Sequence, residues 1–268
     1  MSGTAPGAVK RVTSLQNPII KAVRALHQRK ARQESGLFLA EGHKLMLDAM
    51  EVGWTPTMMV ALEPRDDAAV ETLAARVRAA GGDIIWTNQA VLEKVSRRDN
   101  PQTVLGVFEQ RTVALSTVRG GTVVALEAPR DPGNIGTVIR TADGLGAAAV
   151  VLIGASADPF GVDTVRATMG SIFHMPLARA DLAGFQRFAA NFPGPVIGTH
   201  LEGAVDIRTL SPQEPQVLLM GTEQSGLTED AAGLCDRLVK IPMAGAADSF
   251  NLAVATAIAL YELRRPQL

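Results

Sequence analysis

Short apolar runs and stretches of helical spacing alternate through the first 110 residues. The apolar runs are bounded by turn residues and predict strands at 37–42, 57–62, 83–87 and 104–108. Asn17-Pro18 has the form of a helix start, and Ile19, Val23 and Leu26 follow at helical spacing. Further helices are predicted at 44–50 and 67–80, the second ended by Gly81-Gly82. This alternation predicts a small α/β domain that ends near Gln110.

The rest of the chain predicts a larger parallel sheet. Residues 112–121 lack clear periodicity and end in two glycines, so we interpret them as a linker. A buried strand at 122–128, a glycine-bounded helix at 132–146 and a second buried strand at 148–154 form one βαβ unit. Further strands are predicted at 195–199, 216–220 and 237–241, before a final helix at 251–263. The expected fold class is therefore α/β, with domains at 11–111 and 119–268.

Composition narrows the class of protein. The 268 residues are 47% hydrophobic and 20% charged, as in a globular chain of two domains. No stretch approaches the roughly 18 uncharged apolar residues that a membrane span needs, and the first residues lack the apolar core of an export signal. The single Cys235 allows no internal disulfide, and neither cysteine nor histidine has metal-ligand spacing. We expect a cytoplasmic protein without a metal or a membrane partner, in which Cys235 is a small packing residue.

The basic residues are concentrated at the N-terminus, although the net charge is only −1. No acidic residue precedes Glu34, whereas basic residues recur through this segment at Lys10, Arg11, Lys21, Arg24, Arg29, Lys30 and Arg32. Two interpretations stay open at this point: a surface that binds a polyanion, or a solvated helix face.

The first candidate motif lies at 131–147, DPGNIGTVIRTADGLGA. Asn134 lies in the turn after a predicted strand, and Arg140 follows six residues later in the helix. Both side chains can address the mouth of the sheet, where α/β proteins bind ligands. Taken alone, the pair is also explained by an asparagine cap and a surface arginine.

Two further motifs follow later strands. In VLLMGTEQSGL, the strand runs into Gly221, Glu223 and Gly226; glycines let a ligand approach the backbone, and a carboxylate accepts hydrogen bonds. In VKIPMAGAADSFN, a strand and a proline-containing loop lead to Ser249 and Asn251, which can cap the last helix.

Together the three motifs resemble the SpoU/TrmH family of the SPOUT methyltransferase superfamily. The family pattern Asn-x-Gly-x-x-x-Arg matches 134–140, and Gly-x-Glu-x-x-Gly matches 221–226. Ile-Pro-Met matches 241–243, and Ser-Leu-Asn matches 249–251 with Phe250 in place of leucine. The segments SLQNPIIKAVRAL and GLFLAEGHKLMLDA resemble the family's substrate-binding domain, which is similar to RNA-binding ribosomal proteins.

The resemblance implies an RNA 2′-O-ribose methyltransferase that uses S-adenosyl-L-methionine. It implies a SPOUT catalytic domain with a deep trefoil knot, a small N-terminal ribosomal-protein-like domain, and a homodimer. It favours ribosomal RNA over transfer RNA as the substrate.

The resemblance also assigns residue roles. It places the cofactor among Gly221, Ile241, Met243 and Phe250. Arg140 is then expected to activate the ribose hydroxyl electrostatically, because a guanidinium with a pKa above about 12 is a reluctant base. Asn134 would orient Arg140 or the ribose, and Glu223 would fix the motif loops, while Ser249 and Asn251 would organise the third loop and touch the substrate. RNA affinity is assigned to the basic residues Lys21, Arg24, Arg29, Lys30 and Arg32.

Two other classes of protein were weighed. A nucleotide-dependent oxidoreductase could use Gly144-x-Gly146 as a phosphate loop, but this pair follows a helix, whereas a Rossmann fingerprint follows a strand. A catalytically inactive RNA-binding protein on the same scaffold is the stronger alternative. The presence of all the motif residues argues against it, and a measurement of S-adenosyl-L-methionine binding would discriminate the two.

Overall fold

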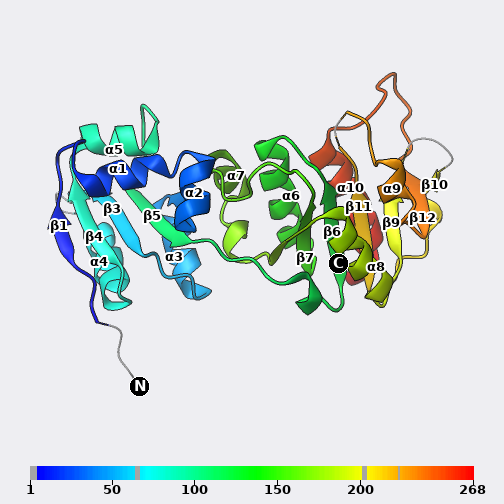
Figure 1. Ribbon diagram of the computed structural model, residues 1–268, viewed down its shortest axis with the longest axis horizontal. Helices are drawn as coiled ribbons and strands as arrows, with labels where there is room; N and C mark the ends of the chain where they lie inside the picture. The colour runs from blue at the N-terminus through cyan, green and yellow to red at the C-terminus, as the bar shows by residue number, and fades with distance from the viewer. Residues whose placement is uncertain (1–4, 64–66, 201–203, 223) are drawn as a thin grey trace. The chain divides into compact units, whose positions relative to one another are not determined.

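The computed structural model describes residues 5–63, 67–200, 204–222 and 224–268, and the chain separates into two compact units. The first unit comprises Met1–Gln110 together with Phe160–Phe173. The second comprises Arg111–Pro159 and His174–Leu268. The α/β class is confirmed for both units, whose strands and helices alternate along the chain (Figure 1).

The first unit has a five-stranded mixed sheet in the order β1-β4-β3-β5-β2. The strands β1 (Val9–Arg11), β4 (Asp83–Thr87) and β3 (Met58–Leu62) are parallel. The strand β5 (Val104–Glu109) runs antiparallel to β3 and to β2 (Leu37–Glu41). The strands predicted from apolar runs are thus all present, and β1 is an additional short edge strand.

Helices cover both faces of this sheet, as Figure 1 shows. One face carries α1 (Pro18–Ala25) and α5 (Gln89–Ser96), whose apolar residues share a core with those of β3, β4 and β5. The other face carries α3 (His43–Glu51) and α4 (Ala68–Ala79). Asn17 caps α1 with its side-chain oxygen, as the sequence predicts, and Asp67 caps α4 in the same way.

The basic N-terminal segment is not one continuous helix. The helix α1 ends at Ala25, and a second helix, α2 (Arg29–Ser35), begins after a turn at 26–28 and ends at Gly36 in the left-handed conformation. Helical spacing alone does not reveal this break, because Leu26 continues the apolar face of α1 into the core.

The segment Phe160–Phe173 leaves the second unit and folds with the first. It contains α7 (Val162–Thr168) and the 3-10 turn η2 (Ser171–Phe173). The ring of Phe160 lies 5.1 Å from that of Phe38, and the ring of Phe173 lies 4.9 Å from that of Phe108. The expected continuous domain at 119–268 therefore needs correction, because aromatic packing places residues 160–173 in the N-terminal unit.

The second unit has a seven-stranded sheet in the order β10-β12-β9-β11-β6-β7-β8, in which every neighbouring pair is parallel. Its strands are β6 (Thr122–Glu127), β7 (Ala149–Ile153), β8 (Leu177–Ala180), β9 (Val196–Thr199), β10 (Val205–Asp206), β11 (Gln216–Met220) and β12 (Arg237–Lys240). The predicted parallel sheet is confirmed. The edge strands β8 and β10 are short and carry no sequence pattern that predicted them.

Layers of helices bury both faces of this sheet. Phe185 of α8 (Leu182–Asn191) and Ala231 of α9 (Glu229–Ala232) pack into a core with one set of strand residues. Alternate strand residues such as Val124 and Leu218 are equally buried and face the opposite layer. There α6 (Pro132–Gly144) and α10 (Leu252–Arg264) contact each other, β7 and β11.

The predicted linker belongs to the second unit. Leu115, in the short turn η1 (Leu115–Thr117), and Val118 pack against the core beneath α8. The backbone N–H of Val113 donates to the carbonyl of Leu177 at 2.8 Å. The segment is therefore fixed to one unit instead of spanning between two.

Candidate active site

The loops that follow β6, β11 and β12 carry the three sequence motifs. In a parallel sheet the carboxyl ends of neighbouring strands share one edge, which is where ligands bind in α/β proteins. The first motif begins α6, where the Asp131 carboxylate accepts from the backbone N–H of Asn134 at 2.7 Å. This cap fixes Asn134 in the first turn of α6, two turns before Arg140.

A side-chain hydrogen bond joins the first and third motifs. Asn251 Nδ2 donates to Asn134 Oδ1 at 3.0 Å. Asn251 also caps α10, because its Oδ1 accepts from the backbone N–H groups of Ala253 at 2.9 Å and Val254 at 3.4 Å. One asparagine thus fixes the start of α10 and orients the amide group of the other.

The second motif forms a closed loop with little free space. Thr222 and Gly226 exchange two backbone hydrogen bonds, of 2.9 and 3.1 Å. A Cβ atom on Gly221 would lie 2.0 Å from the carbonyl carbon of Gly226, so only glycine fits at Gly221. Gly226 has φ +69°, in the region that glycine favours. Glu223 lies outside the described residues.

A buried carboxylate anchors the end of this loop. Glu127, at the end of β6, accepts from the backbone N–H of Thr228 at 2.9 Å and from its hydroxyl at 2.6 Å. Thr228 in turn caps α9. Sequence reasoning missed both residues, because neither belongs to a recognisable motif.

The second and third loops enclose a cavity of about 440 Å³, a size typical of small-molecule sites. All four residues predicted to bind the cofactor line it: Gly221, Ile241, Met243 and Phe250. Ser249 lines it as well. Thr199 and His200, at the end of β9, complete one wall; the topology of a parallel sheet could have predicted them, but no motif marked them.

The lining suits an adenosine-containing cofactor. The apolar side chains of Met220, Ile241 and Leu252 border the cavity beside the exposed backbone of the glycine loop. Such a wall combines apolar contact for a purine ring with backbone donors and acceptors for its edge.

The predicted catalytic residues do not all lie at the cavity, unlike the predicted cofactor-binding residues. Arg140 is exposed on α6 and does not line the cavity, and its side chain makes no hydrogen bond or ion pair with another described residue. Asn134 and Asn251 meet each other, as described above, whereas Ser249 faces the cavity. The structure therefore brings the third loop to the first-motif turn and leaves the guanidinium of Arg140 open to solvent.

The predicted RNA-binding residues divide into two groups. Lys21 and Arg24 are exposed on α1, and Arg29 and Lys30 are exposed on α2. Arg32 is only 4% exposed, and its Nη1 donates to the carbonyl of Leu26 at 2.8 Å. The assignment of Arg32 to RNA is therefore wrong, because its guanidinium stabilises the turn between α1 and α2.

Cys235 lies against the core of the second unit, away from the cavity lining. Burial raises the pKa of its thiol to about 11, and the carboxylates of Asp236 and Glu127 add to this effect. Cys235 is thus a protonated packing residue at neutral pH.

Among the described residues, no group of three or more His, Cys, Asp or Glu side chains could hold a metal ion. In the same part of the chain, no helix is long and apolar enough to cross a membrane.

The parallel sheet, the glycine loop and the cavity at the strand ends define an α/β enzyme with a small-molecule cofactor site. Comparison with known proteins makes this class specific. Residues 121–261 match the model of the SpoU rRNA methylase family, and residues 17–106 match an MRM3-like substrate-binding domain.

Similar proteins cover almost the whole chain. A 23S rRNA (guanosine(2553)-2′-O)-methyltransferase of Bacillus subtilis, RlmP, is 32% identical over 96% of this chain and 100% of its own. The AdoMet-bound crystal structure of an rRNA methyltransferase from Sinorhizobium meliloti is 48% identical, with a TM-score of 0.93 over 98% of this chain and 100% of that one. The AdoMet complex of AviRb from Streptomyces viridochromogenes is 31% identical, with a TM-score of 0.85 over 94% and 98% of the two chains.

The chain belongs to the SpoU rRNA methylase family. It is an RNA methyltransferase that uses S-adenosyl-L-methionine, and its second unit has the SPOUT fold.

Proposed function

We propose that this protein methylates a ribose 2′-hydroxyl in 23S ribosomal RNA in the cytoplasm. The cavity bordered by Gly221, Ile241, Met243 and Phe250, with the Asn134–Asn251 bridge joining the first and third motifs, is the observation that carries this proposal. RlmP and a 23S rRNA (uridine(2479)-2′-O)-methyltransferase of Streptomyces viridochromogenes, 31% identical, support ribosomal over transfer RNA. These two relatives methylate the ribose of different nucleotides, a guanosine and a uridine, so we commit to the ribose and not to the identity of the nucleotide.

The residues of this chain supply binding and charge stabilisation. S-adenosyl-L-methionine, when bound among the four lining residues, supplies an electrophilic methyl group. A 2′-hydroxyl is a weak nucleophile until its developing negative charge is stabilised. Arg140 is available for this role because its guanidinium is exposed and stays positively charged.

Asn134 and Asn251 position the groups around the substrate. The amide of Asn134 is fixed from two sides, by the Asp131 cap on its backbone and by Asn251 on its side chain. We assign Asn134 to orienting the ribose or Arg140, Ser249 to contact with the substrate, and Glu223 to fixing the loops. Loss of the Asn134 amide, which does not line the cavity, should reduce turnover more than cofactor affinity.

The test separates cofactor binding from chemistry. Arg140→Ala should bind S-adenosyl-L-methionine like the unmodified chain in calorimetry, whereas turnover on a 23S rRNA fragment should fall by about 10²–10³-fold, as for the loss of one oxyanion-stabilising donor. Arg119→Ala, at an exposed arginine of the same unit, is the matched control. Full turnover of Arg140→Ala would remove Arg140 from the mechanism, and failure of the unmodified chain to bind the cofactor would favour the inactive alternative.

We also propose a homodimer that uses α10. Val254, Ile258 and Tyr261 are 47%, 37% and 55% exposed, and their spacing places them on one face of this helix. Light scattering should give twice the chain mass of 28.2 kDa. Ile258→Glu should shift the mass toward the monomer, and a fully active monomeric unmodified chain would contradict the dimer.

The trefoil knot implied by the family stays a proposal for the second unit. It is supported by the return of α10, which follows β12 in sequence but packs against α6 and β11. Stretching the chain from both ends should leave it shorter than its full contour length, because a knot tightens instead of opening.

A further inference from the structure

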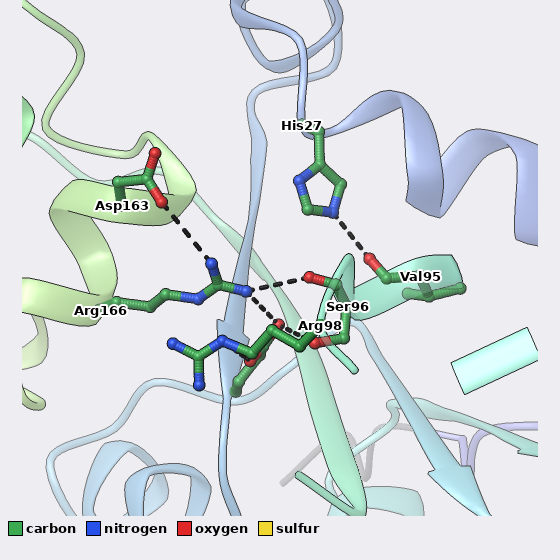
Figure 2. Close-up of polar contacts among 7 residues, drawn as sticks. His27, Val95, Ser96, Arg98, Asp163 and Arg166 are labelled. Atoms are coloured by element: carbon green, nitrogen blue, oxygen red, sulfur yellow. Dashed lines mark hydrogen bonds and ion pairs between the residues drawn. The ribbon is translucent and has the colours of Figure 1, made fainter. Parts of the chain in front are cut away.

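A buried carboxylate in the first unit holds arginines from two distant segments. Glu41 ends β2, and its side chain is only 5% exposed. Its Oε1 accepts from Arg166 Nη2 at 2.8 Å and from the Ser96 hydroxyl at 2.8 Å. Arg98 Nε lies 3.7 Å from Oε2 of the same carboxylate. Figure 2 shows Arg98 and Arg166 in this cluster, with the contacts of Arg166 to Asp163 and to the Ser96 carbonyl as dashed lines.

Arg166 is fixed from three elements. Besides Glu41 on β2, its Nη2 donates to the carbonyl of Ser96 at the end of α5, at 2.9 Å. Its Nη1 lies 3.6 Å from the carboxylate of Asp163 on α7. A buried ion pair needs such additional partners to offset the cost of desolvation. The segment from the second half of the sequence is thereby tied to the N-terminal unit by charge as well as by aromatic packing.

His27 lies close to this cluster and is affected by its charges. Burial lowers the pKa of His27, and the charges of Arg97 and Arg166 lower it further. The ring of His27 is also bound, with Nε2 2.7 Å from the carbonyl of Val95 (Figure 2). The hydrogen bond to Val95 and the charge of Glu41 act in the opposite sense on this pKa, so burial is the main cause of its lowering.

Two of the arginines are open to solvent. Arg97 is exposed at the C-terminal end of α5, and the Arg98 side chain is 43% exposed. Arg98 contacts Glu41 through Nε, and we take its two terminal nitrogens as the groups that face a ligand. The nearby carboxylates are Glu41 and Asp163, both engaged by Arg166, the exposed Asp99, and Glu93, which lies one turn before Arg97 and accepts from Gln89 Nε2.

The arginines follow a helix that packs beside the basic helix α1. The helix α5 packs against α1, on which Lys21 and Arg24 are exposed, and Lys94 is exposed on α5 itself. Exposed basic side chains from two separate segments thus belong to the pair of helices that covers one face of this sheet. A guanidinium presents paired N–H groups that match phosphate oxygens, so the surface suits a phosphodiester backbone better than it suits bases.

We propose that Arg97 and Arg98 bind backbone phosphates of the RNA, with Arg166 behind them adding positive charge. Glu41 is a positioning residue that holds Arg98 and Arg166 in place. This inference rests on the proposed RNA substrate and adds a contact surface that the basic residues of α1 and α2 did not include.

The test compares salt dependence of RNA binding in the full chain. Each phosphate contact adds about 0.7–0.9 to the slope of log Kd against log salt concentration. Arg97→Gln/Arg98→Gln should therefore weaken binding of a 23S rRNA fragment and reduce the slope by roughly 1.4–1.8. Lysine at both positions should keep most of the slope. Arg76→Gln is the control. It removes one positive charge from α4, on the opposite face of the sheet, and should leave the salt slope unchanged.

The outcomes separate this inference from the proposed function. An unchanged slope for the double glutamine variant, with an unmodified chain that binds RNA, would overturn the phosphate site alone. An unmodified chain that binds S-adenosyl-L-methionine but no ribosomal RNA would overturn the proposed function instead.

For Glu41, a positioning role and a purely electrostatic role predict opposite changes in RNA affinity. If Glu41 positions the arginines, Glu41→Gln should weaken RNA binding even though the chain gains positive charge. Tighter binding would mean that Glu41 only cancels charge, which would overturn the positioning role. If Glu41→Gln fails to fold, Ser96→Ala serves in its place. It removes one hydrogen-bond donor to Glu41 and keeps the ion pair, so it should weaken RNA binding slightly.

Discussion

The two units build their functional surfaces from different parts of the polypeptide. In the second unit, the cavity is shaped by backbone: Gly221 packs directly on Gly226, and short loops follow parallel strands. In the first unit, the basic surface is made of long side chains from separate segments, held by the buried Glu41. A backbone-built site leaves a compact sequence motif, whereas a side-chain-built surface leaves none. The comparison explains why the cofactor site was easier to predict than the RNA surface.

The largest test of this contrast is to remove the segment that the second half of the sequence contributes to the first unit. A fragment of residues 1–110 lacks Phe160, Val162, Val165, Ile172 and Phe173, all buried. At about 1.5–3 kcal/mol for each buried side chain, the loss is on the order of 10 kcal/mol, comparable with the whole stability of a domain. We expect the fragment to be unfolded by circular dichroism and NMR.

Restoring the missing segment is the control for that fragment. Residues 160–173 fused to 1–110 through a flexible linker should recover a cooperative thermal transition. Cooperative unfolding of 1–110 alone would show that the aromatic packing is dispensable and that the original boundary near Gln110 was sufficient.

A smaller effect is expected from one added methyl group in the second unit. Gly221→Ala would place a Cβ atom 2.0 Å from the Gly226 carbonyl carbon, so the loop must shift. Overpacking of about 1–3 kcal/mol corresponds to a loss of roughly 10–100-fold in cofactor affinity, measured by calorimetry. RNA binding through the first unit should keep its salt slope.

Gly245→Ala is the matched variant for this prediction. No atom lies within 4 Å of a Cβ at Gly245, in the third loop, so cofactor affinity should be unchanged. Equal affinities for the two alanine variants would contradict a site that depends on close backbone contact.

The smallest expected effect concerns the thiol of Cys235, which packs against the core of the second unit. Because the pKa of Cys235 is raised to about 11, its reactive thiolate is scarce below that pH. At pH 8 alkylation by iodoacetamide should be roughly a hundredfold slower than for a free cysteine of pKa about 8.5, and unfolding should restore the ordinary rate. Equal rates in the folded and unfolded chain, measured by mass spectrometry, would show a reactive thiol in the second unit.

Elements with strong local signals were predictable, and elements fixed by tertiary contacts were not. Buried strands such as β6 and β11 follow from uninterrupted apolar runs. The break between α1 and α2 was missed because Leu26 fits the apolar spacing of α1 whether the helix ends at Ala25 or continues. The short helices α5 and α7 were missed because packing against the sheet stabilises them more than their own composition does.

The same distinction holds for the sites. The lining residues of the cavity were predictable because they lie in motifs with fixed spacing. Thr228 and Glu127 were not, since their hydrogen bonds join residues 101 positions apart. Arg32 was assigned to RNA from charge alone, and charge does not reveal that a guanidinium is buried against the Leu26 carbonyl. Arg166 was overlooked because its partner Glu41 lies 125 residues away.

The placement of Phe160–Phe173 has a consequence for how such proteins can change their target. The region that matches the SpoU rRNA methylase model, 121–261, contains this segment, although it folds with the N-terminal unit. A recombination event that exchanged only the first 110 residues would pair a new sheet with an old α7, and Glu41 would lose its matched Arg166. The arginine surface that we propose for RNA is therefore encoded in two separate pieces of the gene, and a change in one would have to be matched in the other.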